Sequence, residues 1–340
     1  SIYGGGFGVA YATEQGKNTQ DILSDMARLF GKATVKISGG TFFDHVYGGG
    51  DMAQVDETEL YISDKADIRG SVFAGGNGRK KITKANDPNW HPEYIGRVIG
   101  STSLTFSGTS EQAPSIYGDI YGGGNLAQVG GDTNINIYGA NFAGEIFGGG
   151  QGNITEKTTN NNGQTLVSKE ITSADVNGNT NIYLADPGLQ TREKDGTSKD
   201  YFSINVIWNK LWDFNQQKFY AWNNDVEGEE GKDYTVEETR FYDKDKFLNP
   251  HNIYGGGKLA CHVADLATVV VKKGMTPYSL LKTPEWKKSY EDNKHPHFSV
   301  FGGGYGENTS VGSTDVTINV EGEYDEYNGE VDDDTEQLAR

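Results

Sequence analysis

The sequence contains one cysteine, few prolines and no long apolar segment. The single cysteine, Cys261, has no partner for an internal disulfide, and this says little about compartment because many exported bacterial proteins also lack disulfides. No apolar run approaches the roughly 20 residues that span a bilayer, so we expect no membrane span in this segment. Only 8 prolines accompany 47 glycines, and the glycines have no Gly-X-Y period, which excludes a collagen triple helix.

The chain also lacks an excess of positive charge. It has 30 Lys and Arg residues against 48 Asp and Glu residues, which gives a formal net charge of -18. A phosphate backbone would be repelled by this charge, so we expect no nucleic-acid partner. Cationic ligands, cationic surfaces and divalent ions fit the charge better, as does simple solubility.

The most regular feature of the sequence is a repeat built on glycine. The motif Ile-Tyr-Gly-Gly-Gly, or a close variant, defines what we call the YGGG column, which begins at Ile2, Val46, Val72, Ile120, Ile146, Ile253 and Val300. Between these motifs lie two alternating apolar residues, the paired column: Val35/Ile37, Leu60/Ile62, Leu104/Phe106, Ile135/Ile137, Ile182/Leu184, Val269/Val271 and Val316/Ile318. A third apolar anchor, the valine column, precedes each pair: Leu29, Val55, Val98, Val129, Val176, Val263 and Val311.

The repeat length predicts the fold. Val46 and Val72 lie 26 residues apart, as do Ile120 and Ile146. We expect three short strands in each repeat, stacked on the equivalent strands of the next repeat. This gives an all-β fold, a right-handed parallel β-helix of about seven coils. The β-helix is expected to form a single domain over 1–340. A propeller or an antiparallel sandwich is the alternative, and the lack of hairpin dipeptides between neighbouring strands disfavours it.

Five stretches of extra length are expected to leave this repeat as insertions. Three follow a glycine triplet and two follow the paired column; their bounds are 7–28, 77–96, 151–173, 185–251 and 272–298. The spacing of Ile22, Met26 and Leu29 predicts a short helix within 21–30. Residues 151–165 are rich in Asn, Thr and Gly and are expected to be flexible, and 185–251 is expected to form a small β-rich subdomain or a lid.

A threonine two residues before five of the seven pairs is expected to point inward and hydrogen-bond the turn. The threonines concerned are Thr58, Thr102, Thr133, Thr180 and Thr314.

Aromatic residues supply the candidate binding positions. Each YGGG motif carries a Tyr or Phe, and alternation along a strand places these rings on the outer face, where Tyr47 and Tyr121 could stack on sugars. We favour the other interpretation of this column, in which loops cover the rings or the rings join the core. Trp208, Trp212 and Trp222 in the insertion 185–251 are the further candidates for glycan binding.

Candidate catalytic residues form one small group. Asp44, His45, Asp51 and Asp119 lie on or next to the YGGG strands of nearby coils, and polysaccharide-cleaving enzymes need acids and a base on one face. The alternative is that these are ordinary solvated charges at strand ends, and we favour it.

No cofactor is expected. The positions after the glycine triplets form no carboxylate ladder for calcium, which leaves only weak binding by the acidic tail, and His295 and His297 are too few for a metal site.

With Tyr-Gly-Gly-Gly, Gly-Gly-Thr-Phe (39–42) and Leu-Ala-Gln-Val (126–129) in view, the chain resembles the repetitive β-helix regions of large exported bacterial surface proteins. The similarity in repeat style is nearest to Bacteroidota surface proteins and more distant to autotransporter passengers. It implies a segment of a longer chain on the bacterial outer surface, with neighbouring coils, other surface proteins or glycans as partners. A non-enzymatic structural or adhesive role is favoured; a polysaccharide lyase, a glycoside hydrolase-like enzyme or a glycan-binding module is the alternative.

Overall fold

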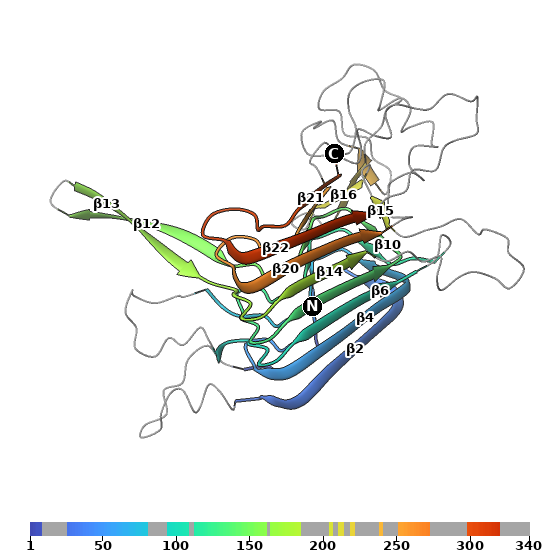
Figure 1. Ribbon diagram of the computed structural model, residues 1–340, viewed down its shortest axis with the longest axis horizontal. Coiled ribbons are helices and arrows are strands. Elements are labelled where there is room, and N and C mark those ends of the chain that lie inside the picture. The colour runs from blue at the N-terminus through green and yellow to red at the C-terminus, as the bar shows by residue number, and fades with distance from the viewer. Residues whose placement is uncertain are drawn as a thin grey trace, which may run out of the picture.

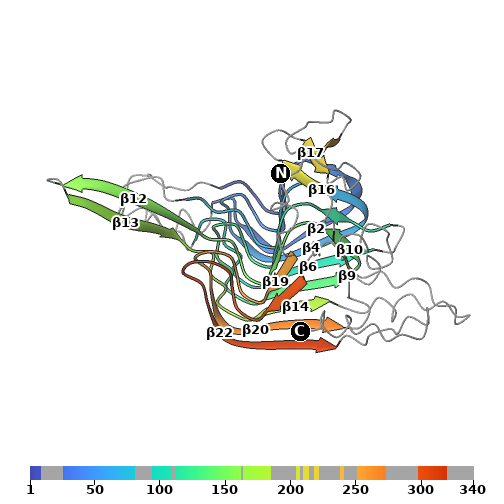
Figure 2. The same ribbon diagram turned by 90° about the horizontal axis from the view of Figure 1, so that it is seen from above.

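The computed structural model describes residues 1–8, 26–80, 94–108, 112–161, 164–184, 204–206, 210–213, 218–221, 238–240, 251–272 and 298–319. These residues form an all-β structure in which parallel strands lie side by side in two large, curled sheets (Figures 1 and 2). No helix in the described part of the chain is long and apolar enough to cross a membrane.

The YGGG motifs form one parallel sheet of seven strands. The strands lie in chain order: β1 (Ile2–Tyr3), β3 (Val46–Tyr47), β5 (Val72–Phe73), β8 (Ile120–Tyr121), β11 (Ile146–Phe147), β19 (His251–Tyr254) and β21 (Phe298–Phe301). The first apolar residue of each motif pairs with its equivalent in the next, including Val46 with Val72 and Ile146 with Ile253. The predicted register of the YGGG column is confirmed.

A second sheet holds the paired column. Its ten strands are β2 (Leu29–Phe42), β4 (Val55–Ile68), β6 (Thr102–Ser107), β7 (Ser115–Ile116), β9 (Thr133–Tyr138), β10 (Ala140–Phe142), β14 (Thr180–Leu184), β15 (Ile204–Val206), β20 (His262–Lys272) and β22 (Ser310–Asn319). The predicted pairs align without a shift, as Leu104 with Ile135 and Ile182 with Val269 show. Bridges such as Val98 to Val129 also join the predicted members of the valine column.

The structure contains a further column that the three-strand repeat did not include. The residues of this bridging column pair in parallel register and lie between the paired column and the YGGG column along the chain: Phe42, Ile68, Ile116, Phe142 and Val206. Val206 lies in β15, which belongs to the expected insertion 185–251. Because β15 pairs with β10, part of this insertion joins the second sheet. The prediction of three strands in each repeat is therefore too simple.

The glycine triplets allow neighbouring units to approach closely. The N–H group of each middle glycine donates to the carbonyl oxygen of the middle glycine in the next strand. Examples are Gly75 to Gly123 and Gly123 to Gly149, both at 3.0 Å. A Cβ atom added to Gly123 would lie 2.7 Å from the backbone nitrogen of Gly150. Glycine is therefore required by the distance between units.

The two sheets enclose one apolar core. Residues of the YGGG, paired and bridging columns fill it, including Val72, Leu104 and Phe142, which are all fully buried. The threonines that precede the pairs point into this interior, as predicted, but their acceptor is not the nearby turn. Thr133 Oγ1 donates to the carbonyl of Gly148 across the interior at 2.6 Å. Thr58, Thr102 and Thr180 make the equivalent bond, whereas Thr314 in β22 is exposed.

The structure differs from two expectations about the insertions. Leu29 and Phe30 belong to β2, where Leu29 pairs with Val55, so no helix extends over them; residues 9–25 lie outside the described residues. The stretch 151–165, expected to be flexible, contributes to an antiparallel hairpin of β12 (Asn153–Asn161) and β13 (Gln164–Thr172). This hairpin projects from the stacked strands (Figures 1 and 2).

The insertion 185–251 also contains a three-stranded sheet of β16 (Lys210–Asp213), β17 (Lys218–Ala221) and β18 (Glu238–Arg240). Most of 77–96 and nearly all of 272–298 lie outside the described residues.

Candidate functional site

The aromatic residues of the YGGG motifs form a continuous stack of rings. Neighbouring rings are nearly parallel, with centroids 4.6 to 5.0 Å apart from Tyr3 to Phe301. They form a cluster separate from the main core, because successive side chains of a strand point to opposite faces of the sheet. Tyr47 is 2% and Tyr121 0% exposed, and each has neighbouring rings on both faces. Neither tyrosine presents a ring face to a sugar, which corrects their assignment as binding residues.

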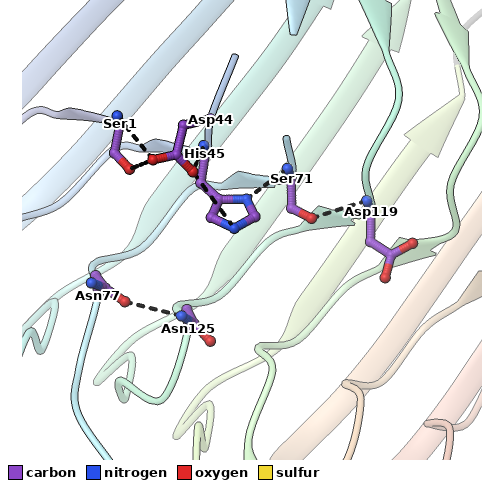
Figure 3. Close-up of polar contacts among 7 residues, drawn as sticks. All are labelled: Ser1, Asp44, His45, Ser71, Asn77, Asp119 and Asn125. Carbon is purple, nitrogen blue, oxygen red and sulfur yellow. Dashed lines mark hydrogen bonds and ion pairs between the residues drawn. The ribbon is translucent and has the colours of Figure 1, made fainter. Parts of the chain in front are cut away.

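Two columns of polar side chains flank the stacked rings. The leading column consists of the residues just before each YGGG motif: Ser1, His45, Ser71, Asp119, Glu145, Asn252 and Ser299. The trailing column consists of the polar residues just after the glycines of the five middle motifs: Asp51, Asn77, Asn125, Gln151 and Lys258; Phe7 and Tyr305 occupy the two end positions. Figure 3 shows members of both columns over neighbouring strands. The candidate catalytic residues Asp51, His45 and Asp119 belong to these columns, and Asp44 precedes His45.

At the N-terminal end of the leading column, polar groups bind one another in a row (Figure 3). The Ser1 hydroxyl donates to Asp44 Oδ2 at 2.6 Å, and the backbone N–H of His45 donates to the same carboxylate at 2.8 Å. Burial alone would raise the pKa of Asp44, but these hydrogen bonds lower it below its ordinary value. His45 Nδ1 accepts the N–H of Ser71, and burial lowers the pKa of this imidazole. The neutral form of His45 is therefore favoured.

The trailing column is held by a ladder of side-chain amides. Asn77 Nδ2 donates to Asp51 Oδ1 at 2.8 Å, and Asn125 Nδ2 donates to Asn77 Oδ1 at 3.0 Å. Arg79 lies 3.8 Å from the other oxygen of Asp51. The Asp51 carboxylate is thus occupied by structural contacts between units.

The densest polar cluster lies around Asp119. Lys258 reaches from the trailing column across the Phe147 ring, 5.2 Å from its centroid, to place Nζ 2.8 Å from Asp119 Oδ2. The same Nζ lies 3.9 Å from Glu145 Oε2, and Asn252 donates to Glu145 Oε1 at 3.2 Å. Burial, with the charge of Asp119 in addition, raises the pKa of Glu145, although Lys258 acts in the opposite direction.

Sequence reasoning named Asp119 but missed Glu145 and Lys258. Their positions in the repeat could have identified them. Glu145 precedes its YGGG motif as Asp119 does, and Lys258 follows its glycines as Asp51 does. What the sequence does not give is that Lys258, 139 residues from Asp119, bends across one intervening unit.

The four candidate catalytic residues do not form one group. Asp44 and Asp119 belong to units separated by the unit of Ser71, and Asp51 lies in the other column.

The tryptophan candidates remain predictions. Trp208 and Trp222 lie outside the described residues, as do His295 and His297. The backbone of Trp212 lies in β16, opposite Phe219 of β17.

Cys261 is fully buried, as expected for a packed residue. Its thiol donates to the carbonyl of Ala174 at 3.0 Å, and burial raises its pKa to about 12.

In the described part of the chain, no three or more His, Cys, Asp or Glu side chains are grouped so that they could hold a metal ion. Comparison with known proteins adds no relationship: no family model, no curated protein and no solved structure matches the chain.

Proposed function

We propose that this chain is a right-handed parallel β-helix of about seven coils that serves as a non-enzymatic structural or adhesive module of an exported bacterial surface protein. The observation that carries the proposal is the unbroken register of the YGGG column, from Ile2 in β1 to Val300 in β21. A right-handed connection is the expected one for parallel strands.

The polar side chains outside the sheet favour a structural role over catalysis on an external substrate such as a polysaccharide. The carboxylates of Asp51, Asp119 and Glu145 each bind a donor from a neighbouring unit. A general acid or base must instead reach a substrate proton. Side chains engaged in this way stabilise the stack.

The last described unit offers a surface for contact with further β structure. Its apolar side chains are exposed where those of earlier units are buried: 45% for Phe301, 38% for Val316 and 48% for Ile318. The strands β21 and β22 each pair on one side only among the described residues. Unpaired strand edges of this kind favour association with a neighbouring coil or another surface protein.

A paired assay separates the adhesive role from the enzyme alternative. The purified chain is incubated with a panel of acidic and neutral polysaccharides and assayed for new reducing ends and unsaturated products. In parallel, bacteria that display the chain are tested for adhesion to glycan-coated surfaces. We expect retention on glycans without product, and reduced retention when Trp208, Trp212 and Trp222 are all replaced by Ala.

The matched control for adhesion is Tyr61→Ala, an exposed aromatic residue of β4 outside the candidate set. Product formation that Asp119→Asn or Glu145→Gln abolishes would establish the enzyme instead. Adhesion that equals that of cells without the chain would contradict the adhesive role.

A further inference from the structure

The contact between Lys258 and Asp119 differs from the other lysine–carboxylate pairs in the described part of the chain. The side chains of Lys258 and Asp119 are 22% and 23% exposed, whereas those of Lys169 and Glu307 are 41% and 56% exposed. The pair lies against the Phe147 ring and beside the buried Tyr121 ring. The two charged groups are therefore partly shielded from water, while the Nζ and Oδ2 atoms lie 2.8 Å apart.

The Asp119 carboxyl group is held by donors on both oxygens. The backbone N–H of Glu145 donates to Oδ1 at 3.0 Å, and the Tyr121 hydroxyl donates to Oδ2 at 2.9 Å. Burial raises the pKa of Tyr121 well above its ordinary value, so this hydroxyl keeps its proton. Fixed donors of this kind stabilise the negative charge that develops when a nucleophile adds to a carboxyl carbon.

The Glu145 carboxyl group lies next to Lys258 Nζ and could carry its protons. Its Oε2 lies 3.9 Å from Lys258 Nζ, and its other oxygen is held by Asn252. The raised pKa of Glu145, caused mainly by burial, suits a carboxyl group that must both accept and release a proton.

We propose that Lys258 and Asp119 join in an intramolecular isopeptide bond, with Glu145 as the catalytic proton carrier. Glu145 takes one proton from the Lys258 ammonium and passes it to the Asp119 carboxylate, and the neutral Nζ attacks Cγ of the resulting carboxylic acid. The Glu145 N–H and the Tyr121 hydroxyl stabilise the tetrahedral intermediate. Glu145 then carries a second proton from the nitrogen to the departing hydroxyl group, which leaves as water. The ammonium and the carboxylate become one amide and one water, with no oxidant or cofactor.

Such a bond would join units that are not neighbours along the chain. Asp119 immediately precedes β8 and Lys258 follows β19, with β11 between these two strands in the sheet. The link would therefore hold three successive strands together. This inference does not depend on the proposed surface role.

Intact-mass spectrometry of the purified full chain tests the proposal. We expect a mass lower than the sequence mass by one water molecule, and a branched peptide joining the segments of Asp119 and Lys258 after proteolysis. Lys258→Arg keeps the positive charge but cannot form this amide, and it should have the full sequence mass. Asp119→Ala should also have the full mass.

Two further variants separate chemistry from folding. Glu145→Gln should keep the circular dichroism spectrum of the parent chain but lose the link, and a link at the parent level would overturn the role of Glu145. Lys169→Arg alters the exposed lysine pair and should keep the link. A folded parent chain that has its full sequence mass would overturn the proposal.

Discussion

At the scale of single residues, His45 shows how the stacked units control a titratable side chain. Burial lowers its pKa, the main effect, while the nearby Asp44 charge opposes this. Its Nδ1 accepts the N–H of Ser71, so His45 connects two neighbouring units through its neutral form.

This arrangement predicts a dependence of stability on pH. A histidine with a lowered pKa binds fewer protons in the folded state, so its contribution to the free energy of unfolding is present above its ordinary value of 6.5 and is lost as pH falls through the lowered value. The effect should be below about 1 kcal/mol, because 35% of the side chain is exposed. Urea unfolding of the parent and His45→Gln at a series of pH values measures it. If the free energy of unfolding changed with pH below 6.5 in the same way for both proteins, the lowered pKa of His45 would be contradicted.

At the scale of elements, the stacked aromatic rings connect neighbouring YGGG strands through side-chain packing. Tyr121 lies between Phe73 and Phe147, with centroids at 4.6 and 5.0 Å. Phe301 has Tyr254 at 5.0 Å, and its side chain is 45% exposed. The two positions have the same register but different burial.

Replacing rings at these two positions should have unequal effects. Tyr121→Ala should lower the free energy of unfolding by about 3–5 kcal/mol, because it removes a fully buried ring and leaves a cavity. Phe301→Ala should cost roughly a third of that or less, because the ring is only partly buried. Thermal and urea unfolding followed by circular dichroism provide the comparison. Equal losses would show that the ring stack does not stabilise the sheet as described.

The register of these elements could be predicted because the same residue types recur at fixed intervals. The bridging column was missed although Phe42, Ile68, Ile116 and Phe142 each lie four residues before a YGGG motif. The predicted helix does not extend over Leu29 and Phe30, because an apolar spacing over a few residues does not reveal that Leu29 pairs with Val55 in the next unit.

The candidate site was less accessible to sequence reasoning. The alternation of side chains along the strand correctly predicted that the rings lie on the opposite face of the sheet from the main core. The burial of the rings could not be predicted in this way, because it depends on polar side chains that cover them. His45 packs edge-on against Tyr47 and Phe73, and Lys258 crosses Phe147. The direction of a long side chain such as Lys258 is set by contacts distant in sequence, and the repeat does not encode it.

At the scale of the whole molecule, the β12–β13 hairpin lies apart from the stacked units. The two strands pair only with each other, and Lys169 of β13 contacts Glu307 near the end of the stack. Leu166 and Val167 are more than half exposed. On either side of the hairpin, Gln151 and Val176 continue the columns of the body.

Removing the hairpin should therefore leave the body folded. Replacing 153–172 with a short Gly-Ser linker should change the thermal midpoint by no more than about 2–4 °C, the effect of about 1 kcal/mol in a protein larger than 150 residues. Ile135→Ala, which empties a position in the main core, should lower the midpoint clearly and serves as the control. Loss of the cooperative transition after hairpin removal would show that the hairpin is part of the folding unit.

The backbone bonds between middle glycines, such as Gly75 to Gly123 and Gly123 to Gly149, run along the direction in which the units are stacked. A tensile load applied along that direction would pull on these bonds end to end and break them one unit after another, at low force. A load applied across the strands would have to shear a whole row at once. The mechanical strength of the molecule therefore depends on the direction of pulling, and a covalent tie between Asp119 and Lys258 would reinforce it in the weaker direction.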